Sequence, residues 1–288
     1  GLPYAGVATD ESGRMDVAAL EEALAKGDVG TVVVTIGTTG LGTVDPLPEI
    51  LALRDQYEFR IHADAAYGGY FGLASEIDEA TRRAIEALHE VDSIVIDPHK
   101  HGLQPYGCGC ILFRDLTVGR FYQHDSPYTY FSSGDLHLGE ITLECSRPGA
   151  SAVALWATHR LLPLQERGEF AAGLDGCLRA ARAFWHKLNE SKLFTPLIEP
   201  PLDIVVYAVN AATASEASRR AREVFESAAR NELHLALIEL PIDFVRPYAP
   251  HIEANVETMT CLRSAMMKPE HEDWVDRITA LLEASAGS

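Results

Sequence analysis

The chain has 288 residues, of which 47% are hydrophobic and 23% are charged, and its formal net charge is −18. This composition is typical of a globular chain with one or two domains, and the acidic balance argues against nucleic acid or an anionic membrane surface as a partner. Without a long apolar run or an N-terminal signal pattern, and with five scattered cysteines that suit reduced thiols, we expect a cytoplasmic protein.

The first half of the chain alternates helical and strand patterns. Asp16 can cap a helix that Gly27 ends. Residues 31–36 form a continuous apolar run with consecutive valines, which is typical of a strand buried on both faces. The other elements predicted here are helices at 46–57 and 78–90 and strands at 60–63, 93–96 and 108–113. Alternation of this kind predicts an α/β fold with parallel strands and right-handed helical crossovers.

The second half begins with a long loop and ends in a smaller α+β pattern. Residues 121–138 form the loop, and loops of this length are usually functional. A helix then carries Trp156, which we assign to the core. Further helices are predicted at 169–189, 215–230 and 270–283, with strands at 202–209, 233–240 and 258–267. We therefore divide the chain into a large domain, residues 1–165, and a small domain, residues 166–288.

Two predicted strand ends carry side chains that suit one cofactor. The strand at 93–96 is followed by Lys100, and the strand at 60–63 is followed by Asp64. In open α/β sheets, ligands bind beyond the carboxyl ends of the strands. Pyridoxal 5'-phosphate needs an amine that bonds to its aldehyde and a carboxylate that keeps its pyridine nitrogen protonated. The pair therefore predicts a pyridoxal phosphate site.

Each side chain also has a simpler interpretation. A lone lysine after a strand is usually surface charge, and a lone aspartate in a βα loop is usually a helix cap, so only the pair favours a functional site. A metal cluster is a second possibility to weigh, because cysteines and histidines lie close together in the sequence. The Cys-x-Cys spacing within a predicted buried strand argues against it. The residues concerned are Cys108, Cys110, His99 and His101.

Two motifs resemble those of a known family. They are His-Ala-Asp-Ala-Ala-Tyr-Gly-Gly at 62–69 and Ile-Asp-Pro-His-Lys at 96–100. Together they resemble the pyridoxal-phosphate-dependent group II amino-acid decarboxylases, the family of glutamate, tyrosine and aromatic amino-acid decarboxylases. The resemblance runs from Gly30 to the C-terminus. It implies the C-terminal portion of a fold type I, aspartate-aminotransferase-like fold, with a mostly parallel sheet and a smaller C-terminal α+β domain.

The resemblance also implies roles for individual residues. Lys100 would bind the cofactor covalently and Asp64 would contact its ring nitrogen. Catalysis would involve Lys100 and His99, with a loop tyrosine, Tyr128 or Tyr130, as the proton donor after carbon dioxide leaves. The remaining cofactor contacts would be Ala66 against the ring, Thr39 near the phenolic oxygen, and Asp97 and His99 near the phosphate. Relatives often have asparagine at the position of Asp97.

The reaction implied by the resemblance is decarboxylation of an L-amino acid to the amine and carbon dioxide. Pyridoxal enzymes of one fold catalyse several reactions, so two alternatives remain. One is a carbon–carbon lyase similar to sphingosine-phosphate lyase, and the other is a chain that is inactive without an N-terminal companion. Family members begin well upstream and supply further strands of the sheet. We therefore expect a homodimer, or a hetero-oligomer with a chain that carries the N-terminal part of the fold.

Overall fold

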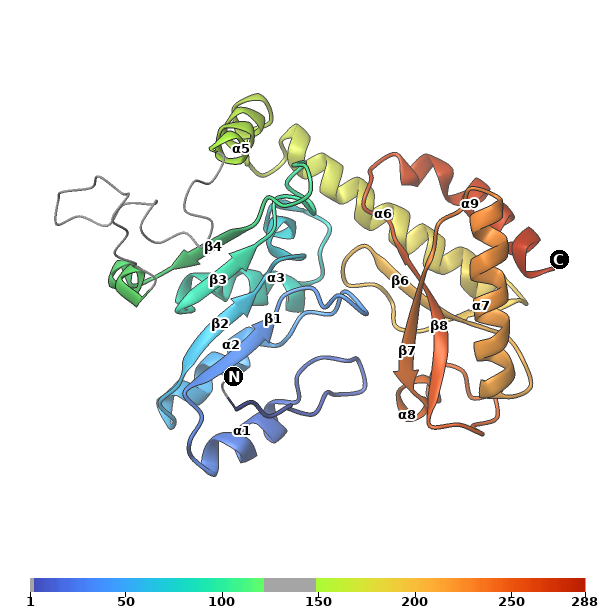
Figure 1. The fold of residues 1–288 in the computed structure, drawn as a ribbon, viewed down its shortest axis with the longest axis horizontal. Helices are drawn as coiled ribbons and strands as arrows, with labels where there is room; N and C mark the ends of the chain where they lie inside the picture. Colours follow the sequence, from blue (N-terminus) through green and yellow to red (C-terminus); the bar gives the residue numbers. More distant parts are fainter. Residues whose placement is uncertain (1–2, 122–148, 288) are drawn as a thin grey trace, which may run out of the picture.

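Two four-stranded sheets organise the computed structural model, which describes residues 3–121 and 149–287 (Figure 1). The first sheet has the strand order β1-β2-β3-β4. Its first three strands are parallel to one another, whereas β4 runs antiparallel to β3. The strands are β1 (Thr31–Thr35), β2 (Arg60–Asp64), β3 (Ser93–Ile96) and β4 (Cys110–Phe113).

The helices of the first half connect these strands. Asp16 caps α1, because its carboxylate accepts hydrogen bonds from the backbone N–H groups of Ala18 and Ala19. In Figure 1, α2 and α3 lie behind the first sheet. The helices are α1 (Val17–Ala25), α2 (Leu47–Ala52) and α3 (Glu79–Glu86), with short 3-10 turns at η1 (Leu53–Asp55), η2 (Gly69–Leu73), η3 (Ala87–Glu90) and η4 (Leu116–Phe121).

Only one face of the first sheet is covered within the described residues. In β1, Val32 and Val34 are buried against the helices, whereas Val33 between them is 53% exposed. The expectation that residues 31–36 are buried on both faces is therefore wrong for this structure. An unbroken apolar run indicates what a strand can bury, but the helices that are present decide which face is covered.

The strand β4 departs from the prediction of parallel pairing. The connection from β3 to β4 contains no α-helix, and parallel neighbours need a long crossover, so the chain returns antiparallel. The sheet as a whole is still mostly parallel, as expected.

The second sheet has the order β5-β6-β8-β7 and is antiparallel throughout. It lies beside the helices α6, α7 and α9 (Figure 1). The sequence pattern does not predict β5 or α8, because each is too short to show a period. The elements are α5 (Ala150–Leu161), α6 (Glu169–Glu190), β5 (Phe194–Pro196), β6 (Ile204–Val209), α7 (Ala214–Arg230), β7 (Ala236–Pro241), α8 (Ile242–Val245), β8 (Thr258–Ala265) and α9 (His271–Ala286).

The helix α6 joins the two sheets. Near its start, Phe170 and Leu174 belong to the core that includes the first sheet, whereas Phe184 and Leu188 belong to the core of the second sheet. The buried carboxylate of Asp175 accepts hydrogen bonds from the loop before α3, from the N–H and hydroxyl groups of Ser75 at 2.8 and 2.7 Å and from the N–H group of Glu76 at 3.0 Å. Because α6 packs in both cores, the domain boundary at residue 165 stays a prediction.

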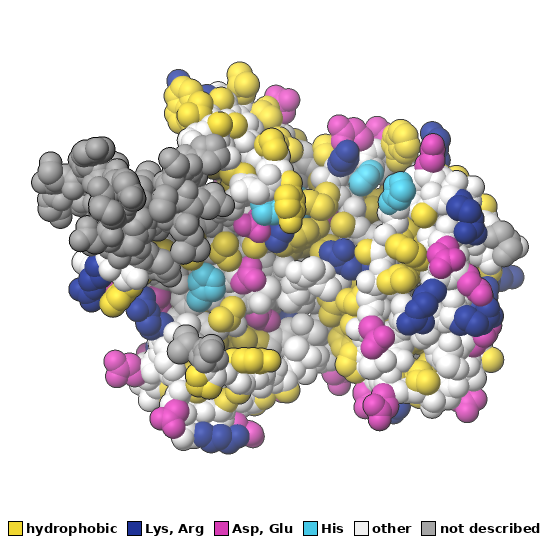
Figure 2. Space-filling view, viewed as in Figure 1, with side chains coloured by type: hydrophobic (Ala, Val, Ile, Leu, Met, Phe, Trp, Pro, Cys, Tyr) yellow, Lys and Arg dark blue, Asp and Glu magenta, His cyan; other side chains and the backbone are white. Residues whose placement is uncertain are grey.

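The helix α5 is the main exception to the expected core. Val153, Trp156 and Leu161 are each more than 60% exposed among the described residues, so the assignment of Trp156 to the core is wrong. Apolar side chains gather over α5 in Figure 2. The helix is apolar on several sides, so its pattern could not indicate which side packs. In the described ranges, no helix has both the length and the apolar character to cross a membrane.

A glycine at position 68 allows the loop after β2 to lie against the end of β1. Its N–H group donates to the carbonyl oxygen of Ile36 at 2.9 Å, and a Cβ atom on Gly68 would lie 2.3 Å from that oxygen. Because backbone cannot move aside, we expect Gly68→Ala to lower the free energy of unfolding by roughly 3 kcal/mol, measured by urea unfolding. Gly30→Ala, whose Cβ would meet nothing within 4 Å, is the control. Equal stability of both variants would contradict this packing.

Candidate active site

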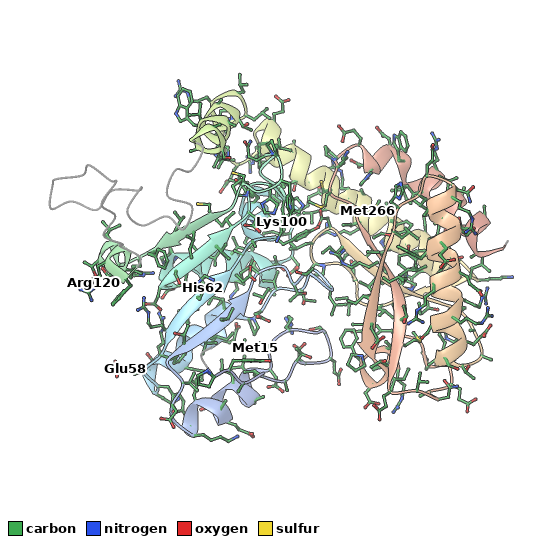
Figure 3. All side chains as sticks on the ribbon, viewed as in Figure 1. Met15, Glu58, His62, Lys100, Arg120 and Met266 are labelled. Carbon is green, nitrogen blue, oxygen red and sulfur yellow. The ribbon has the colours of Figure 1, made fainter. Side chains whose placement is uncertain are left out.

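The strand ends of the first sheet bring Asp64 and Lys100 to one edge. Asp64 is the last residue of β2 and pairs with Thr35 of β1 and Val95 of β3, so the three parallel strands end together. Lys100 follows β3, and the loops after β2 and β3 are joined by a hydrogen bond from the N–H group of Asp97 to the carbonyl oxygen of Ala66, 3.2 Å long. Figure 3 shows Lys100 at the side of the first sheet that faces the second sheet, where Met266 is labelled.

The amine of Lys100 lies beside a carboxylate. Its Nζ atom is 3.2 Å from Oδ2 of Asp97, and Nε2 of His99 is 3.7 Å from the same oxygen. The Lys100 side chain is 29% exposed and that of Asp97 is 18% exposed, so the pair is only partly hydrated. The ring of His99 is oriented by Nδ1, which is 2.7 Å from the carbonyl oxygen of Cys108 and donates to it. Asp97 is therefore the counter-ion of Lys100.

The Asp64 carboxylate is bonded to the backbone of the loop that follows it. Its Oδ1 atom accepts a hydrogen bond from the N–H group of Ala66 at 3.2 Å, and both side chains are half-buried. Thr39 is exposed in the loop that follows β1. From the second sheet, Nε of Arg263 donates to the carbonyl oxygen of Gly40 in the same loop, at 3.2 Å. Loops after all three parallel strands therefore meet at this edge, together with one residue of β8.

A buried hydrogen-bonded cluster lies next to these loops, and the sequence analysis missed it. Nε2 of His101 is 2.8 Å from Oδ2 of Asp203, and the hydroxyl group of Tyr67 donates to Oδ1 of Asp203 at 2.6 Å. His101 is 4% exposed and Asp203 is fully buried. Burial, followed by the Asp203 carboxylate, raises the pKa of Tyr67 far above its usual range, so the phenol remains a donor.

The residues at this edge suit pyridoxal phosphate at its ring and aldehyde. They supply an amine, a carboxylate on the neighbouring strand end and the short side chain of Ala66. Asp97 suits the phosphate less well, because its carboxylate is negative and already contacts Lys100. Tyr128 and Tyr130 lie outside the described residues. Within the described part of the chain, no group of three or more His, Cys, Asp or Glu residues could hold a metal ion.

Comparison with known proteins identifies one family along most of the chain. The family model described as the pyridoxal-dependent decarboxylase conserved domain matches residues 5–210. The L-tyrosine decarboxylase of Enterococcus faecium is 31% identical over 224 residues, which cover 64% of this chain and 36% of that protein. A probable L-aspartate decarboxylase of Pyrococcus furiosus is 32% identical over 194 residues, which cover 67% and 50%. The chain thus spans half or less of the length of these relatives.

Solved structures show the same fold. Mouse CSAD matches with a TM-score of 0.77 at 21% identity, covering 97% of this chain and 58% of that one. Oryza sativa TDC with PLP matches with a TM-score of 0.72 at 19% identity, covering 96% and 53%. The predicted fold is confirmed: a fold type I, α/β arrangement with a mostly parallel sheet and a separate antiparallel sheet.

Proposed function

The chain belongs to the pyridoxal-dependent decarboxylase family, and from that premise we propose that the complete protein decarboxylates an L-amino acid to the amine and carbon dioxide. The observation that carries the proposal is the placement of the Lys100 amine and the Asp64 carboxylate at neighbouring ends of parallel strands. The cofactor of this family is pyridoxal 5'-phosphate. When bound, it accepts the electrons of a bond broken at the α-carbon of an amino acid.

The residues at the strand ends would have different roles in binding and orienting the cofactor. Lys100 would hold the cofactor covalently, release it to the incoming amino acid and afterwards carry a proton. Asp64 would keep the ring nitrogen protonated, because a nearby ionised carboxylate favours the charged form of that nitrogen. Ala66 is small enough to let the ring lie flat, and Thr39 would lie near the phenolic oxygen. Together these side chains would orient the ring and maintain its capacity to accept electrons.

His99 and a loop tyrosine are the remaining predicted catalytic residues. His99 is oriented by the Cys108 carbonyl group, and we propose that it lies near the phosphate and takes part in catalysis. A loop tyrosine, Tyr128 or Tyr130, would return the proton after carbon dioxide leaves, which stays a prediction.

Asp97 provides a test of the charge around the amine. We propose that its carboxylate lies near the phosphate while it also pairs with Lys100. Asp97→Asn keeps the shape but removes one negative charge, so we expect pyridoxal phosphate to bind up to about tenfold more tightly at low salt. The measurement is an absorbance titration of the complete protein. Asp55→Asn, at an exposed position, is the control. Weaker binding by Asp97→Asn would show that the carboxylate itself holds the cofactor.

The activity is tested by measuring carbon dioxide release with the complete protein. The panel contains L-amino acids with aromatic and acidic side chains, since the relatives are named as tyrosine and aspartate decarboxylases. We expect release from at least one of them, dependent on added pyridoxal phosphate. Release of an aldehyde from a phosphorylated amino alcohol, without carbon dioxide, would instead identify a carbon–carbon lyase.

We also propose that the first sheet works within an assembly. Within the described residues no strand pairs with the outer edge of β1, where only Thr35 and Ile36 at its end bond to residues 44–45. Val33 and Ile111 on the uncovered side of the sheet are each more than 50% exposed. Open edges of buried-type strands favour aggregation, so a companion segment, upstream in the same polypeptide or in another chain, would cover them. We expect the isolated 288-residue chain to aggregate or to bind the cofactor weakly, measured by gel filtration and titration. A monodisperse, fully active chain would contradict this proposal.

A further inference from the structure

We propose that Tyr67, His101 and Asp203 form a latch that holds the loops carrying Asp64 and Lys100 in register against the second sheet. His101 and Tyr67 are positioning residues in this proposal, because they act through their neighbours. The proposal rests on the proposed function for its cofactor measurement, but its structural measurement needs no cofactor.

The second sheet determines where the Asp203 carboxylate lies. Asp203 directly precedes β6, and its carbonyl oxygen accepts a hydrogen bond from the N–H group of Met266 at 2.8 Å, just beyond β8. Its side chain is fully buried. The carboxylate is therefore held on the residue that is hydrogen-bonded to Met266, which is labelled together with Lys100 in Figure 3.

Each oxygen of this carboxylate binds one loop of the first sheet. The Tyr67 hydroxyl comes from the loop after β2, three residues beyond Asp64, and donates to Oδ1 at 2.6 Å. His101 directly follows Lys100, and its Nε2 atom is 2.8 Å from Oδ2. One carboxylate thus links both cofactor loops to the second sheet. A shift of Asp203 would move the two loops together.

Packing leaves the His101 ring little freedom. Its centroid is 4.7 Å from that of Tyr67, with the planes at 88°, and 4.7 Å from that of Phe71, with the planes at 61°. Its Nδ1 atom is buried and has no hydrogen-bond partner among the described residues. The ring is therefore held through Nε2, whose N–H group donates to the Asp203 carboxylate.

The Asp203 side chain has a positive charge and two hydrogen-bonding side chains in its surroundings. Arg263 is close enough to lower the pKa of Tyr67, against the effect of Asp203, and therefore supplies a nearby positive charge. Burial, with a further contribution from Asp203, raises the pKa of Cys177 to about 12, so this thiol stays neutral. A buried carboxylate requires donors, and Tyr67 and His101 provide them. An asparagine at position 203 would have only one side-chain oxygen, so it could not offer a separate acceptor to each of the two donors.

The same contacts could simply stabilise the core, and Asp175 provides the matched comparison. It is a buried carboxylate on α6 that also binds a loop of the first half, at Ser75 and Glu76. That loop carries none of the proposed cofactor residues. Asp175→Asn should therefore reproduce the general cost of losing a buried carboxylate without the specific effect on the Lys100 loop.

The experiment compares Asp203→Asn, Tyr67→Phe and Asp175→Asn in the complete protein. Without cofactor, hydrogen exchange is followed in peptides that cover residues 97–104. In this loop the amide groups of Lys100 and Gln104 donate hydrogen bonds to carbonyl oxygens of the same loop. We expect Asp203→Asn to speed this exchange about tenfold and Tyr67→Phe about threefold, with little change in Asp175→Asn. With cofactor, we expect the dissociation constant of pyridoxal phosphate to rise in the same order, by about tenfold for Asp203→Asn.

Two outcomes would overturn the latch. In one, Asp203→Asn and Asp175→Asn, compared at equal loss of melting temperature, change exchange and affinity equally. In the other, Tyr67→Phe leaves both the exchange rate and the dissociation constant at wild-type values. This variant keeps the aromatic ring, so it provides the test if Asp203→Asn does not fold. Failure of the proposed function is detected separately, because the wild-type protein would then release no carbon dioxide from any amino acid of the panel, or would carry no pyridoxal phosphate on Lys100. The exchange measurement would still decide whether the latch orders the loop.

Discussion

Replacing Lys100 with alanine is expected to abolish covalent attachment of pyridoxal 5'-phosphate and to lower carbon dioxide release by roughly 10⁴-fold or more. The reason is that, within the described residues, the only amine beside Asp97 would be lost, together with its proposed role as nucleophile and proton carrier. The measurements are turnover and peptide mapping after borohydride reduction, which should place the pyridoxyl group on Lys100 in the wild-type protein.

A surface lysine provides the control for this variant. Lys187 pairs with Asp276 and is 46% exposed, far from the strand ends in sequence, so Lys187→Ala should retain both label and turnover. Lys100→Arg separates charge from nucleophilicity, because arginine keeps the positive partner of Asp97 but cannot form the covalent bond. A pyridoxyl group found on any other lysine would refute the assignment.

The Asp64→Asn variant is expected to lower turnover by roughly 10³-fold while the cofactor remains attached to Lys100. Asparagine has the same size, and its amide oxygen can still accept the hydrogen bond from the N–H group of Ala66. What it lacks is the negative charge that, in the proposed function, keeps the ring nitrogen of the cofactor protonated. Turnover and the absorbance of the bound cofactor, measured on the same sample, separate loss of electron withdrawal from loss of binding.

A modified cofactor sharpens this test. Pyridoxal phosphate methylated on its ring nitrogen carries a permanent positive charge, so it should restore part of the turnover of Asp64→Asn. Asp55→Asn, at an exposed position, should behave as wild type with either cofactor. If Asp64→Asn has wild-type turnover with the natural cofactor, the ring nitrogen does not depend on Asp64.

Most helices and strands that the local sequence pattern predicts are present in the structure. The Asp16 cap, the valine run of β1 and the α/β alternation are encoded in neighbouring residues, and each appears in the structure. Burial of β1 on both faces was wrong, because it depends on helices that the described residues do not place there. The exposure of Trp156 was missed for a similar reason, since a helix that is apolar on several sides does not indicate its packed side.

The site shows the same division between local and distant information. Lys100 and Asp64 could be placed because each follows a recognisable strand, and the structure brings those strand ends together. The latch could not be predicted from the sequence, because Asp203 is 102 positions from His101 and 136 positions from Tyr67. A buried acceptor that arrives from a different sheet leaves no periodic signal beside the residues it binds. The contact between Lys100 and Asp97, only three positions apart, was within reach of the sequence.

The continuity of α6 has a mechanical consequence. A helix of 22 residues is roughly 33 Å long, and its side chains are held in the cores of both sheets, so it transmits rotation as a lever. A tilt of one degree about one end displaces the other end by roughly 0.6 Å. That displacement is enough to stretch a hydrogen bond of ideal length past its useful range. A tilt that is too small to be called a domain motion can therefore lengthen or break hydrogen bonds at the far end of α6.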